Sequence, residues 1–400
     1  MAYVAARGGE GAILRAEEFF AASLGDPAVR LAAGTLAQTL PYLVDRVMGE
    51  ASLYAPELAA LALTQTGGDL AEAVLLLRAY RSTLPRLGFS RVADGDTMRV
   101  VRRISAAFRD IPGGQFLGPT LDYSHRLLRL DLLDETWPEE RDSKPTFPDP
   151  APSPAPVDAA PLGSSLPFVA DWLRSQQLAA PLPGTPDPEP GQIPDLTRQP
   201  LQIPAPRAIR LQALARADTG GVLTLGYANM RGYGAVHPTV NELRLAHTAV
   251  TGRHPVTGVE FTLGRIRTSL CEVVSSPLDQ AGASQLRLGY CATLGWNELK
   301  ILAGSMLDLA MDLPEPHPSH EEEFVLYHTE IVESSGFCLH YKLPHYVTFA
   351  SELDRLRSVR RDAANAVPGA GQKDGQAEPG DPGDLMNQLN ETGLPTRPSA

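Results

Sequence analysis

Hydrophobic and polar positions in the first 135 residues repeat mostly with the period of an α-helix. One predicted helix opens at Pro56, carries apolar residues three and four positions apart, and ends at Gly67 and Gly68. Asp69 then begins a second predicted helix, in which Glu72 completes a capping box. These signals predict a helical hairpin whose apolar faces belong to a hydrophobic core.

The pattern after residue 207 contains both the strand period and the helix period. A helix is expected from about Ala208 to Ala217. The predicted strands are Val222–Tyr227, Leu243–Thr251, Val259–Ile266 and Gln285–Leu294. The later predicted helices are Asn297–Met311, Glu322–Ser334 and Phe349–Arg361. Strands followed by helices indicate an α+β class, with a mainly antiparallel sheet and flanking helices.

Composition divides the chain into four parts. We expect a mainly helical N-terminal domain at 1–135, a proline-rich linker with one short helix at 136–207, an α+β C-terminal domain carrying a histidine cluster at 208–361, and a disordered tail at 362–400. Within the linker, the apolar positions of Leu166–Leu178 predict an amphipathic helix that docks on a core.

Charge and cysteine usage exclude several classes of protein. The net charge of −12 and the sequence pI near 5.3 argue against nonspecific nucleic-acid binding, which needs a basic surface. The three cysteines have no paired spacing, as is typical of a reducing compartment. No apolar run reaches eighteen residues and the N-terminus lacks a signal-like apolar region. We therefore expect a cytoplasmic protein that does not cross a membrane.

A glycine-rich bend after Arg102 is dense in functional groups. Its glycines and prolines break helices and expose backbone amides, and arginines flank it. A polyphosphate or an acidic partner would suit this bend, although an ordinary loop beside a solvated helix end explains the same pattern. The candidate residues here are Arg103, Arg109, Asp110, Gly113, Gly114, Asp122, His125 and Arg126.

Three of the nine histidines, His328, His340 and His345, fall within eighteen positions. Imidazole binds divalent transition metals and oxyanions and transfers protons near neutral pH. His340 and His345 can converge only if the chain bends between them, and Pro344 favours such a bend. Spacing alone leaves open a metal site, an anion site, or two unrelated polar residues.

Several motifs in order along the chain resemble the PhnI family of the bacterial carbon–phosphorus lyase machinery. They include Gly8-Gly9-Glu10, Asp45-Arg46, Arg103-Ile-Ser105, Asp110-Ile-Pro-Gly-Gly-Gln115, Leu117-Gly-Pro-Thr120, Asp122-Tyr123, Arg231-Gly-Tyr-Gly234, His237-Pro238 and Lys342-Leu-Pro-His-Tyr-Val347. The resemblance spans roughly residues 1–135 and 208–361.

The resemblance implies phosphonate catabolism. Together with PhnG-, PhnH- and PhnL-like partners, such a protein displaces the purine of ATP with an alkylphosphonate, and alone it acts as a purine-nucleotide nucleosidase. The products are adenine and an α-D-ribose 1-phosphonate 5-triphosphate. The resemblance also implies a PhnJ-like partner, two copies in the complex, and a divalent metal, with zinc first, on His340 and His345.

Displacement at an anomeric carbon needs a proton for the purine, negative charge near the sugar, and cations around the anionic reactants. The expected catalytic residues are Asp110, Asp122, His125 and His237. The expected substrate-binding residues are Arg103, Arg109, Gly113, Gly114, Arg126, Arg231 and Tyr233, of which Tyr233 would stack on the base.

Two other functions remain open from the sequence. A metal-dependent phosphohydrolase would use His328, His340 and His345 as ligands and would release phosphate. A noncatalytic scaffold would use the histidines only to contact a partner. Release of free purine from ATP separates both alternatives from the nucleosidase.

Overall fold

The computed structural model describes residues 9–25, 32–128, 130, 166–180, 192–233, 237–275, 285–343 and 345–365. The chain forms two compact units. One unit is Ala6–Lys342, and the other joins Met1–Ala5 with Leu343–Ala400. Residues 131–135 of the expected N-terminal domain and residues 136–165 and 181–191 of the expected linker lie outside the described residues.

Short helices form the beginning of the larger unit, as the helical period predicts. They are α1 (Glu10–Ser23), α2 (Ala33–Thr39), α3 (Pro41–Ala51), α4 (Pro56–Gln65) and α5 (Leu70–Thr83). The carboxylate of Asp69 accepts a 3.1 Å hydrogen bond from the Glu72 amide, so the expected cap of α5 is confirmed. Helices α3, α4 and α5 bury a shared apolar cluster that includes Val47, Leu63 and Val74.

Four described strands form one antiparallel sheet in the order β1-β2-β3-β4, which confirms the α+β class. The strands are β1 (Met98–Ile104), β2 (Thr239–Arg253), β3 (Glu260–Ser275) and β4 (Arg287–Leu294). Strand β1 was not expected, because it lies in the part of the chain predicted to be helical. It pairs with β2, so the two domains expected from composition share one sheet within one compact unit.

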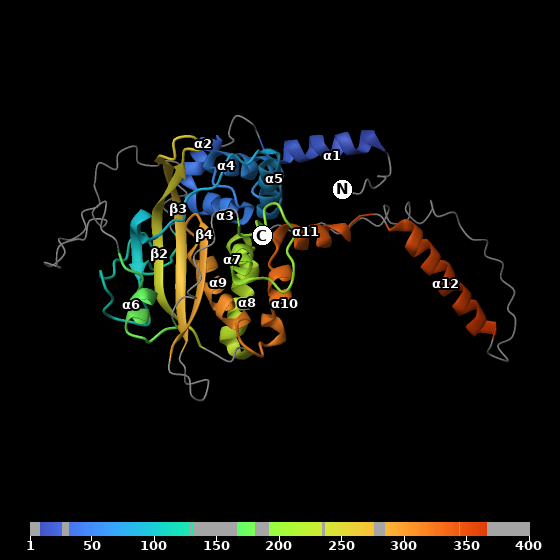
Figure 1. The fold of residues 1–400 in the computed structure, drawn as a ribbon. Helices are drawn as coiled ribbons and strands as arrows, with labels where there is room; N and C mark the ends of the chain where they lie inside the picture. Colours follow the sequence, from blue (N-terminus) through green and yellow to red (C-terminus); the bar gives the residue numbers. More distant parts are fainter. Residues whose placement is uncertain are drawn as a thin grey trace. The chain divides into compact units, whose positions relative to one another are not determined.

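Helices cover the two faces of the sheet differently (Figure 1). On one face lies α6 (Val169–Ser175), which confirms the docked helix predicted in the linker. The other face packs against α9 (Glu298–Met311). The sequence predicted this helix from Asn297 to Met311, so its observed start differs by one residue. Helix α7 (Arg207–Arg216) packs on β4 and on α9, whereas α8 (Thr219–Ala228) packs on α9. Helix α10 (Glu322–His328) contacts α7 and α8. Leu243, Cys271 and Ile301 lie in the core between the sheet and these helices.

Two expected elements were wrong. Val222–Tyr227 was predicted to be a strand but lies in α8, because Asp218 caps this segment as a helix and α8 packs along α9. The single helix expected at Glu322–Ser334 is two helices, α10 and α11 (Ile331–His340). The first of these helices ends at Thr329, whose carbonyl accepts a hydrogen bond from the Asp218 amide at 2.7 Å.

The smaller unit contains α12 (Tyr346–Asn365), which is longer at both ends than the predicted helix. The first residues of the tail expected at 362–400 therefore belong to α12, and residues 366–400 lie outside the described residues. No described helix is long and apolar enough to cross a membrane.

Candidate functional site

The glycine-rich bend is fastened to the sheet by Arg103, whose side chain is fully buried. Its Nε donates to Glu242 Oε1 at 2.5 Å. Its two terminal nitrogens donate to the carbonyls of Pro112 at 2.5 Å, Gly114 at 3.0 Å and Pro167 at 2.8 Å. Arg103 therefore ties the bend and the start of α6 to the sheet, and its contacts are those of a structural residue.

Gly113 makes the close approach of the bend possible. It has a φ of +83°, and a Cβ at this position would lie 2.7 Å from Leu166 Cδ2 and 3.0 Å from Arg103 Nη1. Gly114 also has a positive φ, of +75°. These glycines are explained by backbone conformation and packing.

Two buried glutamates hold the first turn of α6 on the sheet. Glu242 Oε2 accepts the Val169 amide at 2.9 Å, and Glu272 Oε2 accepts the Ala170 amide at 3.2 Å. Burial, and then the charge of Glu242, raises the pKa of Glu272 to about 7. The helix N-terminus stabilises negative charge on this pair.

Asp122, one of the expected catalytic residues, belongs to an ionic cluster around the buried Arg102. Arg102 contacts Asp122 at 2.6 Å and Glu298, in the first turn of α9, at 2.8 Å. The Thr120 hydroxyl, and then Arg102, lowers the pKa of Asp122, whereas burial raises the pKa of Glu298. Asp122 is thus ionised at neutral pH, which does not suit a proton donor.

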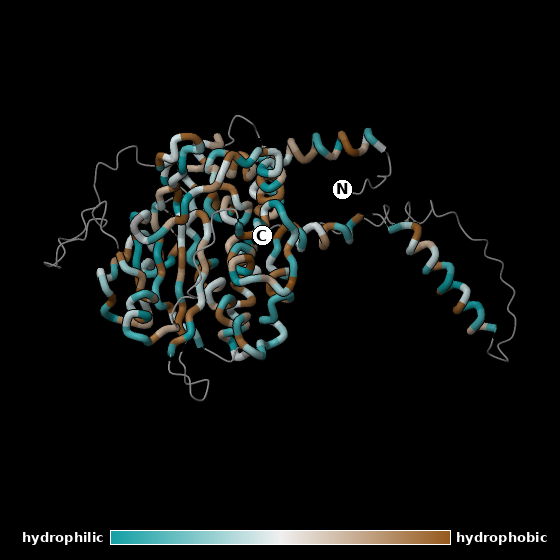
Figure 2. The backbone as a smooth tube through the Cα atoms, viewed as in Figure 1, coloured by the Kyte–Doolittle hydropathy of each residue, from teal (hydrophilic) through white to brown (hydrophobic). Residues whose placement is uncertain are grey.

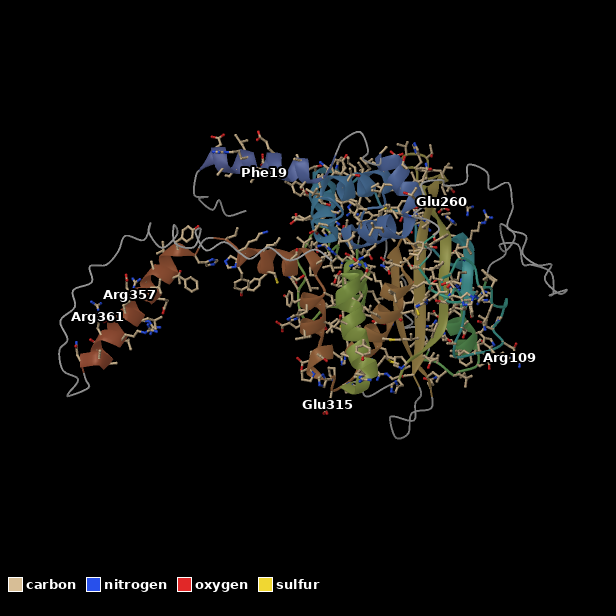
Figure 3. The ribbon with its side chains drawn as sticks, turned by 180° about the vertical axis from the view of Figure 1, so that it is seen from behind. Phe19, Arg109, Glu260, Glu315, Arg357 and Arg361 are labelled. Atoms are coloured by element: carbon tan, nitrogen blue, oxygen red, sulfur yellow. The ribbon has the colours of Figure 1, made fainter. Side chains whose placement is uncertain are left out.

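The remaining residues predicted from the bend and from the segment before β2 lie on the surface. Arg109 is exposed (Figure 3), as are Asp110, His125 and Arg126. The bend brings Arg126 to within 3.8 Å of Asp122. His237 is exposed and precedes β2.

The bend and the start of β2 are neighbours, because the amides of Ala106 and Ala107 both donate to Val240 O. The structure therefore brings this end of β2 beside the bend. Arg231 and Tyr233 lie instead in the π-helical turn Asn229–Tyr233 that follows α8. Arg231 is exposed there.

The three clustered histidines have different local settings. The His328 ring stacks on Phe324 at 4.1 Å between ring centroids, and its Nδ1 donates to Phe324 O at 2.7 Å. His340 ends α11 in the larger unit, and His345 precedes α12 in the smaller one. The Nδ1 of His345 donates to Leu343 O at 2.6 Å, which places the lone pair on Nε2. Within the described residues, no group of three or more His, Cys, Asp and Glu side chains could hold a metal ion.

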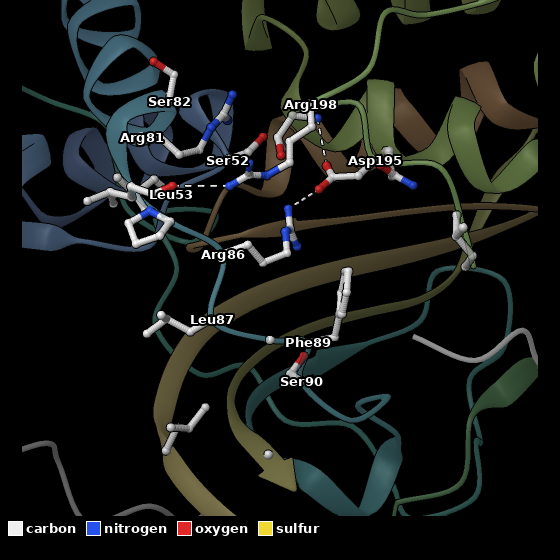
Figure 4. A pocket seen from close by; sticks show the side chains of 18 of the residues that line it. Ser52, Leu53, Arg81, Ser82, Arg86, Leu87, Phe89, Ser90, Asp195 and Arg198 are labelled. Carbon is white, nitrogen blue, oxygen red and sulfur yellow. Dashed lines mark hydrogen bonds and ion pairs between the residues drawn. The ribbon is translucent and has the colours of Figure 1, made fainter. Parts of the chain in front are cut away.

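A large cleft that the sequence did not reveal lies in the larger unit (Figure 4). Its volume is about 1100 Å³. It is lined by Arg81 at the end of α5, Arg86 in the following segment, Arg198 before α7, and Arg253 at the end of β2. We call this the arginine cleft. These arginines are far apart in the sequence, so no local motif could have indicated it.

The carboxylate of Asp195 lies among these arginines. It forms an ion pair with Arg86 and accepts the Thr197 amide at 2.8 Å. Burial raises the pKa of Asp195, but hydrogen bonds from Thr197 and the charges of Arg86 and Arg198 outweigh burial and lower it. Asp195 is therefore an anion at neutral pH. It orients Arg86 and neutralises only part of the positive charge.

Comparison with known proteins gives a consistent result. The family model described as "Bacterial phosphonate metabolism protein (PhnI)" matches residues 2–363. The chain is 46% identical to the putative C-P lyase subunit protein HtxH of Stutzerimonas stutzeri, over 92% of this chain and 98% of that protein. It is 41% identical to the alpha-D-ribose 1-methylphosphonate 5-triphosphate synthase subunit PhnI of Rhizobium meliloti, over 94% and 99% of the two chains. It is 39% identical to the Escherichia coli subunit of the same name, over 90% and 99%.

Proposed function

We propose a function from one premise: the chain belongs to the PhnI family of bacterial phosphonate metabolism proteins. It is a subunit of an alpha-D-ribose 1-methylphosphonate 5-triphosphate synthase in a carbon–phosphorus lyase system. The observation that carries this proposal is the near-complete coverage of relatives that bear this name, at 39% and 41% identity.

The reaction displaces the purine of ATP with an alkylphosphonate. The bond between C1 of the ribose and the purine nitrogen breaks, an oxygen of the phosphonate bonds to C1, and the departing adenine takes up a proton. Attack on the face opposite the base converts a β-nucleotide into an α-product. Held beside C1, the phosphonate competes with water through its high effective concentration. Without partners, water takes the place of the phosphonate, and the chain acts as a nucleosidase.

The catalytic groups proposed from the sequence are Asp110, Asp122, His125 and His237. The ionised state of Asp122 supports stabilisation of a positively charged sugar, and its pairing with Arg102 fixes the carboxylate in place. His125 and His237 are exposed, so each is accessible to a ligand or to a neighbouring subunit. This exposure supports an active site that is completed by residues of a partner subunit.

The partners are PhnG-, PhnH-, PhnJ- and PhnL-like subunits, and the protein is present in two copies in a cytoplasmic complex. The surface of α12 supports a role as a subunit, because this helix exposes large apolar side chains. They are Tyr346, Phe349, Leu353, Leu356 and Val359, which lie three or four positions apart. Brown and teal stretches alternate along α12 in Figure 2. Such an apolar stripe is typical of a helix that packs on another chain.

A divalent metal, with zinc first, is proposed for His340 and His345. The donor chemistry fits, because the bond of His345 Nδ1 to Leu343 O is the orientation that metal-ligating histidines use. A bound metal would supply Lewis-acid chemistry to the complex.

The experiment that tests this function incubates the purified full-length chain with ATP and measures free adenine. Adenine together with ribose 5-triphosphate is expected from the chain alone. With the partner subunits and methylphosphonate, phosphorus NMR is expected to show a phosphonate ester at C1 and an intact triphosphate. Inorganic phosphate without adenine would instead identify a phosphohydrolase. No consumption of ATP in any combination would identify a scaffold.

A further inference from the structure

The arginine cleft has no role in the family comparison or in the residues proposed above. Its walls come from the end of α5, the segment that leads to β1, the loop before α7, and the turn region between β2 and β3 (Figure 4). All of these segments lie within the larger unit, so the cleft is complete in a single chain.

Positive charge is concentrated in the arginine cleft. Its described lining residues contain four arginines and one carboxylate, a formal charge of +3 in a chain of net charge −12. Burial, and then the charge of Arg78, lowers the pKa of Arg81, and Arg198 acts in the same direction. Cations that destabilise one another in this way are stabilised by a bound polyanion.

The guanidinium groups of the cleft carry more N–H donors than their hydrogen bonds within the protein use. Arg86 donates to Asp195, Arg81 to Ala51 O, and Arg198 to Leu84 O at 3.3 Å, and the Nε of Arg253 donates to Gly258 O at 3.0 Å. Each guanidinium makes one such bond in the described structure, although it carries five N–H donors in a planar fork. Forks of this kind match the oxygens of a phosphate chain.

Apolar side chains adjoin the arginines. Phe89, Phe261 and Leu263 line the cleft and keep about half of their surface or more exposed, with exposed fractions of 50%, 45% and 66%. The guanidinium of Arg86 lies 4.8 Å from the centroid of the Phe89 ring. Exposed aromatic faces beside cations accept a purine, which stacks on any flat ring.

We propose that the arginine cleft binds a purine nucleoside triphosphate, with the arginines on the triphosphate and the apolar side chains on the base. Its volume of about 1100 Å³ accommodates a ligand of this size. The choice of a nucleotide rests on the function proposed above. The choice of a polyphosphate rests only on the charge and the donors of the cleft.

Two probes test this assignment on the purified full-length chain. Calorimetry measures two constants, the Kd of inorganic tripolyphosphate and the Kd of ATP. Arg253→Gln removes one charged fork and is expected to raise both values about tenfold. Leu87→Glu adds a negative charge at a side chain that is 96% exposed, so folding is unaffected, and both values rise at least about threefold. Leu87→Lys is expected to lower them.

Matched controls lie outside the cleft. Arg174→Gln removes an arginine that pairs with Asp171 in α6, and Phe19→Glu adds an acid at an exposed position of α1. Both controls are expected to keep the two wild-type Kd values. Thermal unfolding of every variant verifies the fold.

Equal tripolyphosphate affinity in the wild type, Arg253→Gln, Leu87→Glu and Leu87→Lys would overturn the proposal. Loss of a partner subunit from Leu87→Glu with both Kd values unchanged would overturn it too, because the cleft would then be a docking surface. The proposed function fails separately: tripolyphosphate then binds as expected, but the wild-type chain and its complex release no adenine.

Discussion

Two consecutive arginines of β1 show how a single side chain acquires its role. Arg102 and Arg103 point to opposite faces of the sheet, and both are almost completely buried. Arg102 forms ion pairs with Asp122 and Glu298. Arg103 forms an ion pair with Glu242 and donates hydrogen bonds to three backbone carbonyls. A buried guanidinium is tolerated only when its donors are satisfied, so these partners define the local structure.

Replacing Arg103 with Met is expected to lower the free energy of unfolding by about 3 kcal/mol or more. The change leaves the carbonyls of the bend without their donor and leaves Glu242 with one cation fewer. Chemical denaturation measures the effect. Arg109→Met, at an exposed arginine of the same bend, is the matched control and is expected to change little. Equal stability of the two variants would contradict the structural role of Arg103.

Glu272 is expected to make the stability of the protein depend on pH. Its pKa is raised in the folded chain from 4.5 to about 7, chiefly by burial, so the folded state binds more protons than the unfolded state between these values. Stability therefore falls as the pH rises from about 4.5 to about 7, by on the order of 3 kcal/mol for this group.

Glu272→Gln removes this titration and retains the shape of the side chain. Urea denaturation at pH 5 and pH 7 is the measurement. The loss of stability between the two values is expected to be smaller in the variant than in the wild type. An identical pH dependence in both proteins would show that Glu272 has an ordinary pKa.

At the scale of elements, caps and packing decided what the hydrophobic period left ambiguous. The run Val222–Tyr227 is short, apolar and rich in residues that suit a strand, yet it lies in α8. Asp218 caps this helix by accepting the Gly221 amide at 2.6 Å, and it also pairs with Arg46 at 2.9 Å. Short apolar runs fit a buried helix and a buried strand equally well by period alone.

Asp218→Ala is expected to lower the free energy of unfolding by about 1–2 kcal/mol, because both the cap and the ion pair are lost. Asp69→Ala is the comparison, since Asp69 caps α5 through the Glu72 amide. Asp69→Ala is expected to lower the free energy of unfolding by about 1 kcal/mol. Thermal or chemical unfolding ranks the two variants. An Asp218→Ala protein as stable as the wild type would mean that packing alone specifies α8.

At the scale of the whole molecule, one sheet joins regions that composition separates. Strand β1 comes from the predicted helical domain and pairs with β2 of the predicted C-terminal domain, although more than a hundred residues lie between them. The metal-binding role proposed for His340 and His345 comes from the resemblance to a family whose members are subunits of a larger complex. The prediction for this pair therefore concerns the assembled complex.

The double variant His340→Ala with His345→Ala is expected to lose a bound divalent metal without unfolding the chain. Both residues lie outside the hydrophobic clusters of the protein, and a site with few protein ligands loses most of its affinity with one imidazole. Elemental analysis of the purified complex measures the metal content. His328→Ala is the control, since His328 is outside the proposed pair and its ring stacks on Phe324. Unchanged metal in the double variant would leave an anion-binding or structural role.

The sequence by itself determined the elements whose signals are local. The α4–α5 hairpin, the cap at Asp69, the docked helix α6, most of the sheet and the start of α9 were all predicted. Period, capping residues and turn residues act within a few positions, so they can be read without knowing the fold. The motifs that occur in order along the chain likewise sufficed to indicate the family, and the comparisons confirm it.

Only the tertiary structure decided which side chains meet. It buried Arg103 against Glu242, paired Arg102 with Glu298, and added β1 to the sheet. It also gathered four arginines from separate segments into one cleft. Burial, pairing and pKa shifts depend on distances across the fold. Residues remote in sequence approach one another only when the sheet and its helices have packed, so no local pattern specifies these contacts.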